Sequence, residues 1–451
     1  MSSNHTPLIS PYIPSAAKVY RDGYVVKQSE LLASAIALAD HLPPSSFVLN
    51  LCEDRFYFLL SFMAALINRQ TNILPPDRKM ETVTLVAAEY PDNIFLVDTD
   101  DYEGLPNCLD IRKLDMQCAI RALKEMPQIR NDHIAAIAFT SGSTGAPKAN
   151  NKTWQTLLGT AQRLGERFKM AGVPTNIVAT VPSQHMYGLE MTVMMALQAN
   201  CIIHCAHPFF PADIVMSLTE IPEPRVLVST PVHLRALMGL NTPMPVLERV
   251  VSATAPLSTE IAVKVASKFN TSVDEIYGCT EAGSIATRNS ESSEPWQLLE
   301  GIRLEESHGE YRVRADHFSH EVVLNDVIEM FSEGTFKLLG RSADMLNVGG
   351  KRASLADLNH KLLSIEGVTD GVVFLPDQDS TDEQRPAALV VSDTLTEKEI
   401  LCLLAKFMDP VFLPRPLRRV SALPRNDTGK IPLKSLKSVL AQAQNELSAD
   451  T

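Results

Sequence analysis

Short apolar segments recur along the N-terminal two thirds of the chain, and each is followed by residues with the spacing of an amphipathic helix. These segments are SSFVLNL, FLVDT, IAAIAFT, NIVATVP, CIIHCA, RVLVST, RVVSAT and VDEIYG. An apolar run of this length, bounded by turn residues and alternating with helices, is typical of a strand in a parallel sheet whose two faces are both covered. The pattern therefore predicts an α/β fold with largely parallel sheets flanked by helices.

The pattern changes after about residue 300, where apolar and polar residues alternate between turn residues. GEYRVRAD, HEVVLND and GTFKLLGR predict an antiparallel subdomain. From Leu355 onward, SLADLNHKLLSI and TEKEILCLLAKFM predict helices, and TDGVVFLP and AALVVSD predict strands. We place a boundary near Ser342 to Asp344, so that residues 1–341 form a large N-terminal domain and residues 342–451 a small α+β C-terminal domain.

The overall charge excludes two classes of partner. The 451 residues include 41 Lys and Arg against 53 Asp and Glu, a formal net charge of −12. A field of this sign repels phosphate backbones and anionic lipid headgroups, so we expect neither a nucleic-acid nor a membrane partner. The longest apolar run, Phe56 to Ile67, is shorter than the roughly 20 residues that cross a bilayer, and it predicts a buried helix.

The seven cysteines are odd in number and form no CxxC pair, which is typical of reduced thiols and predicts a cytoplasmic location. One cluster, Cys201, His204, Cys205 and His207, has the residue types of a metal site. It lies inside the apolar run ANCIIHCAHPFF, however, and alternation along a strand sends the two cysteines to one face and His204 to the other. We therefore expect no metal at this cluster.

A dense polar loop directly follows the apolar segment IAAIAFT. Its residues are Thr140, Ser141, Gly142, Ser143, Thr144 and Gly145, and Lys148 follows shortly after. Glycine lets the main chain approach a ligand, and backbone NH groups and hydroxyls donate hydrogen bonds, so the loop predicts a cradle for a polyphosphate. It is not a Walker A loop, because Pro147 precedes the lysine and no Ser or Thr follows it to hold magnesium.

The loop resembles the one that holds the β and γ phosphates of ATP in the adenylate-forming superfamily. That superfamily includes acyl-CoA synthetases, aryl-CoA ligases and nonribosomal peptide adenylation domains. Further motifs follow in the order of the family, namely SATAPL, YGCTE, GRSADMLNVGGKRAS and LPRNDTGKIPLKSL. The resemblance covers about residues 130–437 and implies an AMP-forming ligase that uses ATP and Mg²⁺.

The resemblance also implies roles for single residues. Glu281 would help to hold Mg²⁺, because a triphosphate repels a carboxylate unless a hard cation lies between them. Lys430 would stabilise charge on the carboxylate and the α phosphate while the adenylate forms. Thr280 would contact the α phosphate, Asp326 and Arg341 would bind the ribose hydroxyls, and the adenine would lie along Ser252, Ala253, Thr254, Ala255 and Pro256 and against Tyr277 and Gly278.

In the implied reaction a carboxylic acid and MgATP form an acyl adenylate and pyrophosphate, and a thiol then attacks the adenylate. The thiol is coenzyme A or the phosphopantetheine of an acyl carrier protein that acts in trans. Residues 1–341 would be the AMP-binding core, and residues 342–451 a mobile lid that carries the catalytic Lys430. Rotation of the lid would remove Lys430 and bring Gly349 and Gly350 beside the pantetheine arm, which a side chain would block.

The segment VPSQHMYGLE, Val181 to Glu190, matches the acid-pocket motif of the family. Amino acid adenylation domains place an Asp here to pair with the α-ammonium group, and this chain has His185 instead, which disfavours an amino acid substrate. We expect His185 to pack on the substrate or, alternatively, to be an ordinary core histidine. Tyr187 and Gly188 are further lining candidates, and the methionines near them are lining or core residues (Met186, Met191, Met194, Met195).

Several features depart from the larger synthetases. Only about 135 residues precede the phosphate loop, and only 45 separate Glu281 from Asp326. Leu324 and Asn325 stand where the family has Thr and Gly, and Ala343 occupies the usual polar hinge position. The compact length and the segment PWQLLEG resemble the small ligases of aryl-polyene pigment pathways, so we expect an aromatic acid of the hydroxybenzoate or cinnamate type.

Alternatives stay open for both substrates. The acid could instead be a medium-chain or long-chain fatty acid, and a non-catalytic nucleotide-binding homologue is a further alternative. Between Arg415 and Lys437 lie seven basic residues and one acid. This basic strip suits the 3′-phosphate of coenzyme A and the acidic helix of a carrier protein equally well, or is an ordinary solvated surface.

Overall fold

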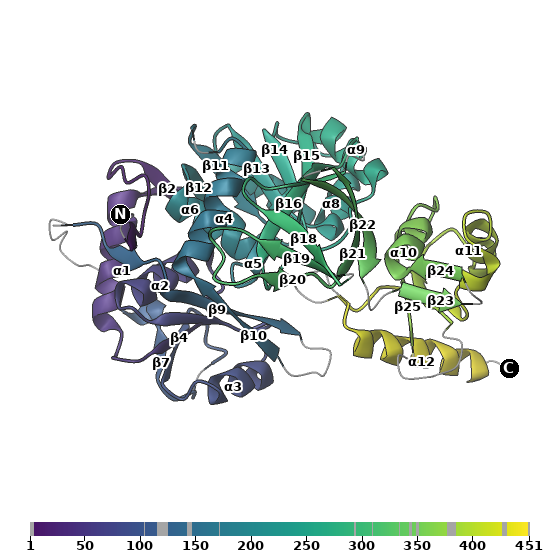
Figure 1. Cartoon of the computed structure of the whole chain (residues 1–451), viewed down its shortest axis with the longest axis horizontal. Coiled ribbons are helices and arrows are strands. Elements are labelled where there is room, and N and C mark those ends of the chain that lie inside the picture. The colour runs from purple at the N-terminus through teal and green to yellow at the C-terminus, as the bar shows by residue number, and fades with distance from the viewer. Residues whose placement is uncertain are drawn as a thin grey trace.

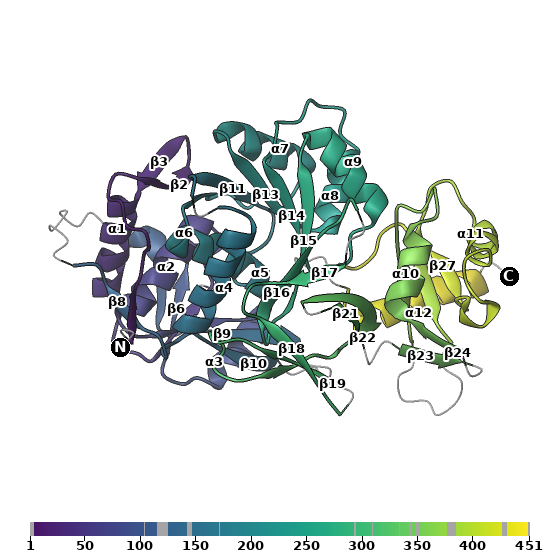
Figure 2. The same ribbon diagram turned by 45° about the horizontal axis from the view of Figure 1, so that its top comes forward.

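The computed structural model describes residues 4–102, 104–114, 125–141, 147–170, 172–292, 295–308, 310–332, 334–341, 345–348, 351–376, 385–425 and 431–449. Two large sheets and the helices around them make up most of the molecule, and the C-terminal elements lie together at one end of it (Figures 1 and 2).

The larger sheet has the strand order β21-β22-β17-β16-β15-β14-β13-β11-β12-β2-β3. Its middle part, from β15 to β2, is parallel, and both flanks are antiparallel. The parallel strands are mostly buried because helices cover both faces. In chain order the strands are β2 (Ala17–Arg21), β3 (Tyr24–Lys27), β11 (Thr175–Ala179), β12 (Cys201–His204), β13 (Arg225–Ser229), β14 (Arg249–Ser252), β15 (Ser272–Cys279), β16 (Gly283–Asn289), β17 (Trp296–Leu298), β21 (Asp326–Ser332) and β22 (Thr335–Arg341).

The smaller of the two large sheets has the order β10-β9-β5-β4-β6-β7, and it is parallel except for the hairpin of β9 and β10. A separate antiparallel pair joins β1 (His5–Pro7) to β8 (Gln128–Arg130). The six strands are β4 (Phe47–Asn50), β5 (Thr71–Leu74), β6 (Asn93–Val97), β7 (Cys108–Asp110), β9 (Ile134–Ser141) and β10 (Pro147–Thr153).

The helices of this part of the chain pack against both sheets. They are α1 (Gln28–His41), α2 (Arg55–Ile67), α3 (Met80–Ala88), α4 (Trp154–Arg167), α5 (Met186–Gly188), a π-helix (Leu189–Met194), α6 (Met195–Gln198), α7 (Pro211–Glu220), α8 (Pro231–Met238) and α9 (Thr259–Phe269). The apolar run predicted as a buried helix is α2, whose first turn is capped because the Asp54 carboxylate accepts from the backbone NH groups of Phe56 and Tyr57.

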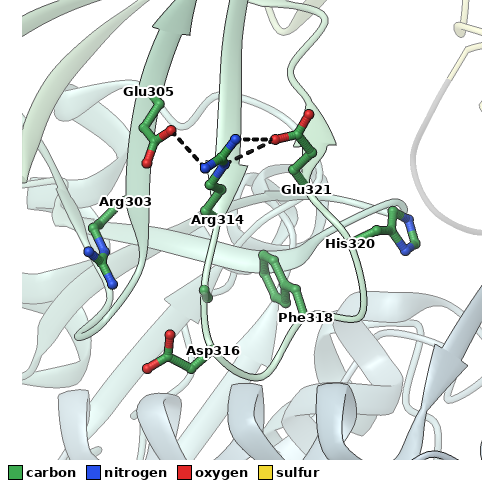
Figure 3. A pocket seen from close by; sticks show the side chains of 8 residues that line it. Arg303, Glu305, Arg314, Asp316, Phe318, His320 and Glu321 are labelled. Atoms are coloured by element: carbon green, nitrogen blue, oxygen red, sulfur yellow. Dashed lines mark hydrogen bonds and ion pairs between the residues drawn. The ribbon is translucent and has the colours of Figure 1, made fainter.

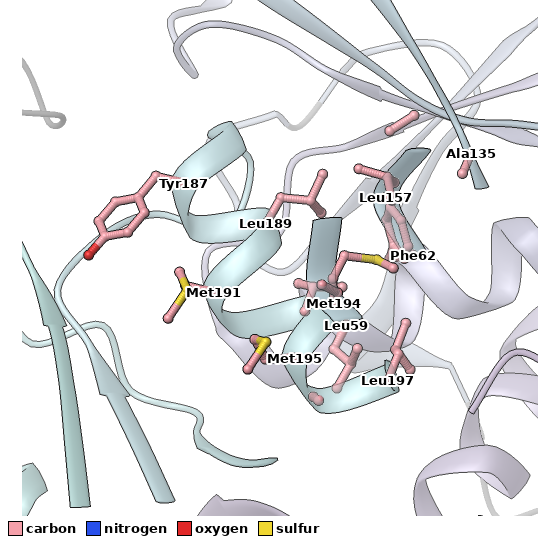
Figure 4. Packing of buried hydrophobic residues seen from close by; sticks show 14 of the residues in the cluster. Leu59, Phe62, Ala135, Leu157, Tyr187, Leu189, Met191, Met194, Met195 and Leu197 are labelled. Atoms are coloured by element: carbon pink, nitrogen blue, oxygen red, sulfur yellow. The ribbon is translucent and has the colours of Figure 1, made fainter. Parts of the chain in front are cut away.

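The main hydrophobic core lies where α2 meets the π-helix and α6. Met191, Met194 and Met195 are fully buried, and they gather with Leu59 and Phe62 (Figure 4). Of the two alternatives for the methionines, the structure therefore favours the core for these three. Met186 is only partly buried and packs at the border of the same cluster.

A three-stranded antiparallel sheet of β18 (Arg303–Ser307), β19 (Glu310–Arg314) and β20 (Val322–Val323) lies beside the larger sheet. The C-terminal elements form a small α+β domain. Its hydrophobic clusters share no residue with those that precede β23. The elements are β23 (Met345–Val348), β24 (Lys351–Ser354), α10 (Leu355–Leu363), β25 (Asp370–Phe374), β26 (Ala387–Val391), α11 (Glu397–Leu404), β27 (Leu417–Arg419) and α12 (Leu433–Ala449).

These observations confirm the predicted fold class, with largely parallel sheets, an antiparallel part and a small α+β C-terminal domain. The predicted boundary at residues 342–344 lies outside the described residues. Within the described part of the chain, no helix combines the length and the apolar character needed to span a bilayer.

Candidate active site

Two of the predicted nucleotide motifs lie at one edge of the larger sheet, where parallel strands end. Ser252 is the last residue of β14, and β15 ends at Cys279 on the neighbouring strand. The carboxyl ends of parallel strands are the usual place for ligands in open α/β sheets. The sequence motifs SATAPL and YGCTE are therefore brought to the same edge.

Buried hydrogen bonds to Glu275 of β15 hold the end of the SATAPL segment in place. The NH group of Leu257 donates to the Glu275 carboxylate at 2.9 Å, and the other oxygen of Glu275 accepts from Arg288 and Ser290. Residues 254–256, which come directly before Leu257, are exposed. Thr254 has a φ of +78°, which is strained for a β-branched residue and is the kind of strain that binding loops retain.

A hydrogen bond joins two predicted nucleotide motifs that are far apart in the sequence. The Tyr277 hydroxyl donates to Asp326 Oδ2 at 2.7 Å, and Asp326 lies opposite Arg341 in the register of β21 and β22. The Tyr277 ring packs against Trp296 and Phe336, with ring centroids 5.5 and 5.6 Å away. The predicted adenine residue and the predicted ribose pair are thus neighbours.

The YGCTE segment forms a tight turn between β15 and β16. A Cβ atom at Gly278 would lie 2.2 Å from the Gly283 carbonyl oxygen, so any side chain there would force the strands apart. Thr280 and Glu281 lie at the tip and are half-buried. Burial and the nearby charge of Glu281 raise the pKa of Cys279 to about 12, so Cys279 stays a neutral thiol. A carboxylate such as that of Glu281 is the kind of oxygen ligand that Mg²⁺ binds in proteins.

The polar loop predicted to hold phosphates connects β9 to β10. Thr140, near the end of β9, lies opposite Lys148 in the antiparallel register, and Lys148 is exposed. Thr153 is the last residue of β10, and its hydroxyl caps α4 by accepting from the Thr156 NH group. Several predicted residues lie outside the described residues: Gly142, Ser143, Thr144, Gly145, Gly349, Gly350 and Lys430, together with the side chains of Ser141 and Arg341.

The acid-pocket motif begins the helix that leads into the π-helix. His185 is half-buried at the N-cap of α5. The Tyr187 hydroxyl donates to the Val251 carbonyl at 2.8 Å, and its side chain points away from the methionine core (Figure 4). Gly188 lies against the preceding segment, because a Cβ atom there would be 2.0 Å from the Pro182 carbonyl oxygen.

The cysteine and histidine cluster has no shared centre in the structure. The His204 Nε2 atom lies 2.9 Å from the Glu220 carboxylate, whereas His207 Nε2 lies 2.9 Å from the Thr180 carbonyl. Among the described residues, no three His, Cys, Asp or Glu side chains are grouped closely enough to hold a metal ion.

A polar cavity of about 420 Å³ lies apart from these motifs, on the sheet of β18 to β20 (Figure 3). Within it, Arg314 pairs with both Glu305 and Glu321. Among the described residues, none of the predicted site residues lines this cavity. The lining residues are Arg303, Glu305, Arg314, Ala315, Asp316, Phe318, His320 and Glu321.

The family model of AMP-binding enzymes matches residues 43–308, which is more than half of the chain. The chain belongs to the AMP-binding enzyme family. The expected membership of the adenylate-forming superfamily is thereby confirmed. The matched region includes the phosphate loop, the acid-pocket motif and the YGCTE turn of this AMP-binding enzyme.

Curated relatives of this AMP-binding enzyme are named as ligases. One is the 4-coumarate–CoA ligase of Halorhodospira halophila, 28% identical over 330 residues, covering 70% of this chain and 81% of that protein. Another is the 3,4-dihydroxybenzoate–[aryl-carrier protein] ligase of Bacillus anthracis, 24% identical over 341 residues, covering 73% of this chain and 77% of that protein.

Solved structures share the fold. The o-succinylbenzoate CoA synthetase of Bacillus subtilis in complex with its acyl-adenylate intermediate has a TM-score of 0.81 at 18% identity, with 96% of this chain and 98% of that chain covered. ATP-bound MatB from Rhodopseudomonas palustris has a TM-score of 0.80 at 18% identity, with 94% and 96% covered.

Sequence reasoning missed several buried charged residues of this AMP-binding enzyme that lie behind the motifs. Among them, Arg55, Lys152, Glu190 and Glu275 are each at most 2% exposed. A charge inside an apolar helix or beside a buried strand is the signal that could have found them, because such a charge needs a specific partner.

Proposed function

We propose that this enzyme is an AMP-forming acid–thiol ligase that uses ATP and Mg²⁺. The main support is the hydrogen bond between Tyr277 and Asp326, which joins the expected adenine and ribose contacts within a member of the AMP-binding family. The names of the relatives, which are CoA and carrier-protein ligases, support the same activity.

In the first half-reaction a carboxylate oxygen attacks the α phosphorus of ATP. The bond between the α phosphorus and the bridging oxygen breaks, and pyrophosphate leaves. Glu281 would hold the metal, Thr280 would contact the α phosphate, and Lys430 would balance the charge that develops between the two reactants. Asp326 and Arg341 would fix the ribose, and residues 252–256 would border the adenine.

In the second half-reaction a thiol attacks the acyl carbon, AMP leaves, and the thiol proton passes to solvent. We place the domain boundary at residues 342–344, so that residues 1–341 form the core and residues 342–451 a mobile lid. The separate hydrophobic clusters on the two sides of this boundary support that division. Gly349 and Gly350 would admit the pantetheine arm of coenzyme A or of an acyl carrier protein.

We propose an aromatic carboxylic acid as the substrate. Two relatives are named for 4-coumarate and 3,4-dihydroxybenzoate, and both of these acids are aromatic. His185 at the pocket motif offers no carboxylate to an α-ammonium group, which disfavours amino acids. Tyr187 and Gly188 would form the wall of the pocket near the adenine segment, since Tyr187 bonds to Val251 just before Ser252.

The test is pyrophosphate exchange into ATP with a panel of benzoic, cinnamic, hydroxybenzoic, medium-chain and amino acids. Exchange with aromatic acids is the expected result, and exchange with aliphatic acids alone would assign a fatty acyl ligase instead. Lys430→Ala should lower exchange at least 100-fold while ATP affinity stays nearly unchanged. No exchange with any acid would favour a nucleotide-binding homologue without this activity.

A further inference from the structure

Two opposite charges are buried on either side of the YGCTE turn. Lys152, on β10, is 1% exposed, and its ammonium group donates to the Glu281 carbonyl oxygen at 2.5 Å. It is the one fully buried side chain of a strand whose other residues are exposed or half-buried. The Lys152 ammonium group therefore connects β10, the strand after the phosphate loop, to the backbone of Glu281, the expected magnesium ligand.

Glu190 holds the other end of the same turn. It lies in the π-helix, is 1% exposed, and accepts from the Ser284 hydroxyl at 2.5 Å and from the Ser284 NH group at 3.2 Å. Gly283, with a φ of +82°, lies so close that a Cβ atom would be 2.3 Å from Glu190 Oε1. The turn is thus fixed at residue 281 by Lys152 and at residue 284 by Glu190.

The two charges act on each other although they do not form a direct ion pair. Burial raises the pKa of Glu190 to about 7, and the nearby Lys152 and Ser284 oppose that rise. Burial likewise lowers the pKa of Lys152, and Glu190 opposes that shift. Removing either charge alone would leave the other buried with less compensation.

Stability alone does not account for this arrangement. Burying a charge costs several kcal/mol, and well-packed apolar residues of similar volume often stabilise a fold equally well or better. Polar contacts differ from apolar ones in that they fix one position of the turn where apolar contacts would allow several. The turn in question contains Thr280 and Glu281.

We propose that Lys152 and Glu190 are positioning residues that hold Glu281 in place to bind the magnesium ion of MgATP. The proposal rests on the proposed function, in which Glu281 contacts that metal. Lys152 connects the turn to the phosphate-loop strand, and Glu190 connects it to the helix of the acid pocket. Outer contacts of this kind typically change metal affinity or activity by about 10- to 100-fold when removed.

The test is the affinity for ATP with and without Mg²⁺, measured by calorimetry on the full chain, because this readout needs no knowledge of the acid. The wild type should bind ATP more tightly with Mg²⁺. Lys152→Met and Glu190→Gln should each reduce this magnesium-dependent gain about tenfold or more, while affinity for metal-free ATP changes little. Lys152→Arg, which keeps the charge, should retain part of the gain.

The matched control is Lys18→Met. Lys18 is also 1% exposed and donates to two backbone carbonyls, those of Ala199 and Cys201, at 3.0 and 3.2 Å. Its loss should lower the melting temperature to a similar extent and leave the magnesium-dependent gain intact. Equal losses of that gain in Lys18→Met and Lys152→Met would overturn the proposal, because they would indicate a general effect of instability.

The double variant Lys152→Met/Glu190→Gln keeps the test decisive if a single variant does not fold. With both charges removed, no lone charge is buried, so the variant should regain stability without regaining the magnesium effect. A double variant with the wild-type magnesium effect would overturn the proposal, as would a wild type that shows none. Pyrophosphate exchange is scored separately, so a wild type without exchange contradicts the proposed function and leaves the magnesium test valid.

Discussion

Gly188 determines how closely the acid-pocket helix approaches the segment before it. The Pro182 carbonyl oxygen occupies the space in which any Cβ atom would lie. A single methyl group at this position would therefore displace His185 and Tyr187 together. Gly188 is therefore important because it has no side chain, so that the Pro182 carbonyl oxygen can lie against it. A motif match alone does not explain this.

Gly188→Ala should accordingly destabilise the protein by about 1 to 3 kcal/mol, the usual effect of overpacking, and should strongly reduce acid-dependent pyrophosphate exchange. Differential scanning calorimetry and the exchange assay measure the two effects. Gly239→Ala is the control, because its Cβ atom would meet only the Ala236 carbonyl oxygen, at 3.4 Å. Equal effects of the two variants on stability and on pyrophosphate exchange would show that the close contact at Gly188 is not required for the activity.

His317 gives the fold a sensitivity to acid. Burial and the nearby Arg163 lower its pKa to about 3, against about 6.5 in an unfolded chain. The unfolded state therefore binds the proton first, so the stability contributed by neutral His317 is complete above pH 6.5 and is lost as the pH falls toward 3. In His317→Gln, the loss of unfolding free energy between pH 6.5 and pH 3 should be smaller than in the wild type by on the order of 3 kcal/mol, measured by urea unfolding. The exposed His320→Gln should leave the dependence unchanged, and a wild-type slope in His317→Gln would contradict the assignment.

At the scale of elements, α2 is held in place by a buried cation. Arg55 donates to the hydroxyls of Ser183 and Thr192 and to the carbonyls of Ala179 and Val181. These acceptors belong to the end of β11, the pocket motif and the π-helix. One side chain thus connects a core helix to the segment that leads to His185.

Arg55→Met should destabilise the protein by about 3 kcal/mol or more, because it leaves several buried acceptors without a donor. Urea unfolding should show a lower midpoint with an unchanged m-value. Arg130→Met removes an exposed arginine paired with Asp132 and should hardly shift the midpoint. A shift of the same size in both variants would contradict a special role for Arg55.

The elements also show what sequence patterns can and cannot predict. Apolar runs located most of the parallel strands, because a strand buried on both faces has to be apolar along its length, but β5 and β7 were not among the predicted segments. The hairpin of β2 and β3 was missed, although the dipeptide of Asp22 and Gly23, both with positive φ, is a strong hairpin signal. The π-helix after Gly188 was missed because its hydrogen-bond pattern depends on tertiary contacts.

The candidate site was predictable only in part, for a related reason. The motifs predict which residues meet the nucleotide, but the hydrogen bond between Tyr277 and Asp326 depends on how β21 joins the sheet, which no local pattern encodes. Lys152 and Glu190 were missed because their partners are distant in sequence.

At the scale of the whole molecule, an ion pair joins the C-terminal domain to the rest of the chain. Asp370, on β25, lies 2.6 Å from Arg425 of its own domain and 3.7 Å from Arg235 of α8. Arg235 is partly desolvated there, which lowers its pKa, and Asp370 opposes that shift. Asp370 is therefore shared between an internal contact and a contact with the larger part of the molecule.

Arg235→Gln should loosen the contact between these two parts without disturbing the pair of Asp370 and Arg425. Small-angle X-ray scattering should show a broader distribution of interatomic distances in the variant, and raising the salt concentration should shift the wild type in the same direction. Lys264→Gln removes a positive charge from the neighbouring α9 and should have no such effect. Identical scattering from wild type and Arg235→Gln would show that the ion pair does not hold the two parts together.

The aromatic contacts around Tyr277 should make the intrinsic tryptophan fluorescence of the chain sensitive to nucleotide binding. It contains two tryptophans, of which Trp154 is fully buried, whereas Trp296 packs against Tyr277 and under the Arg288 guanidinium. Emission from Trp154 should thus be a constant background, and emission from Trp296 should change when a purine ring settles beside Tyr277. Nucleotide titrations can then be followed by intrinsic fluorescence in the unlabelled protein, with Trp296→Phe, which keeps only the constant Trp154 emission, as the reference.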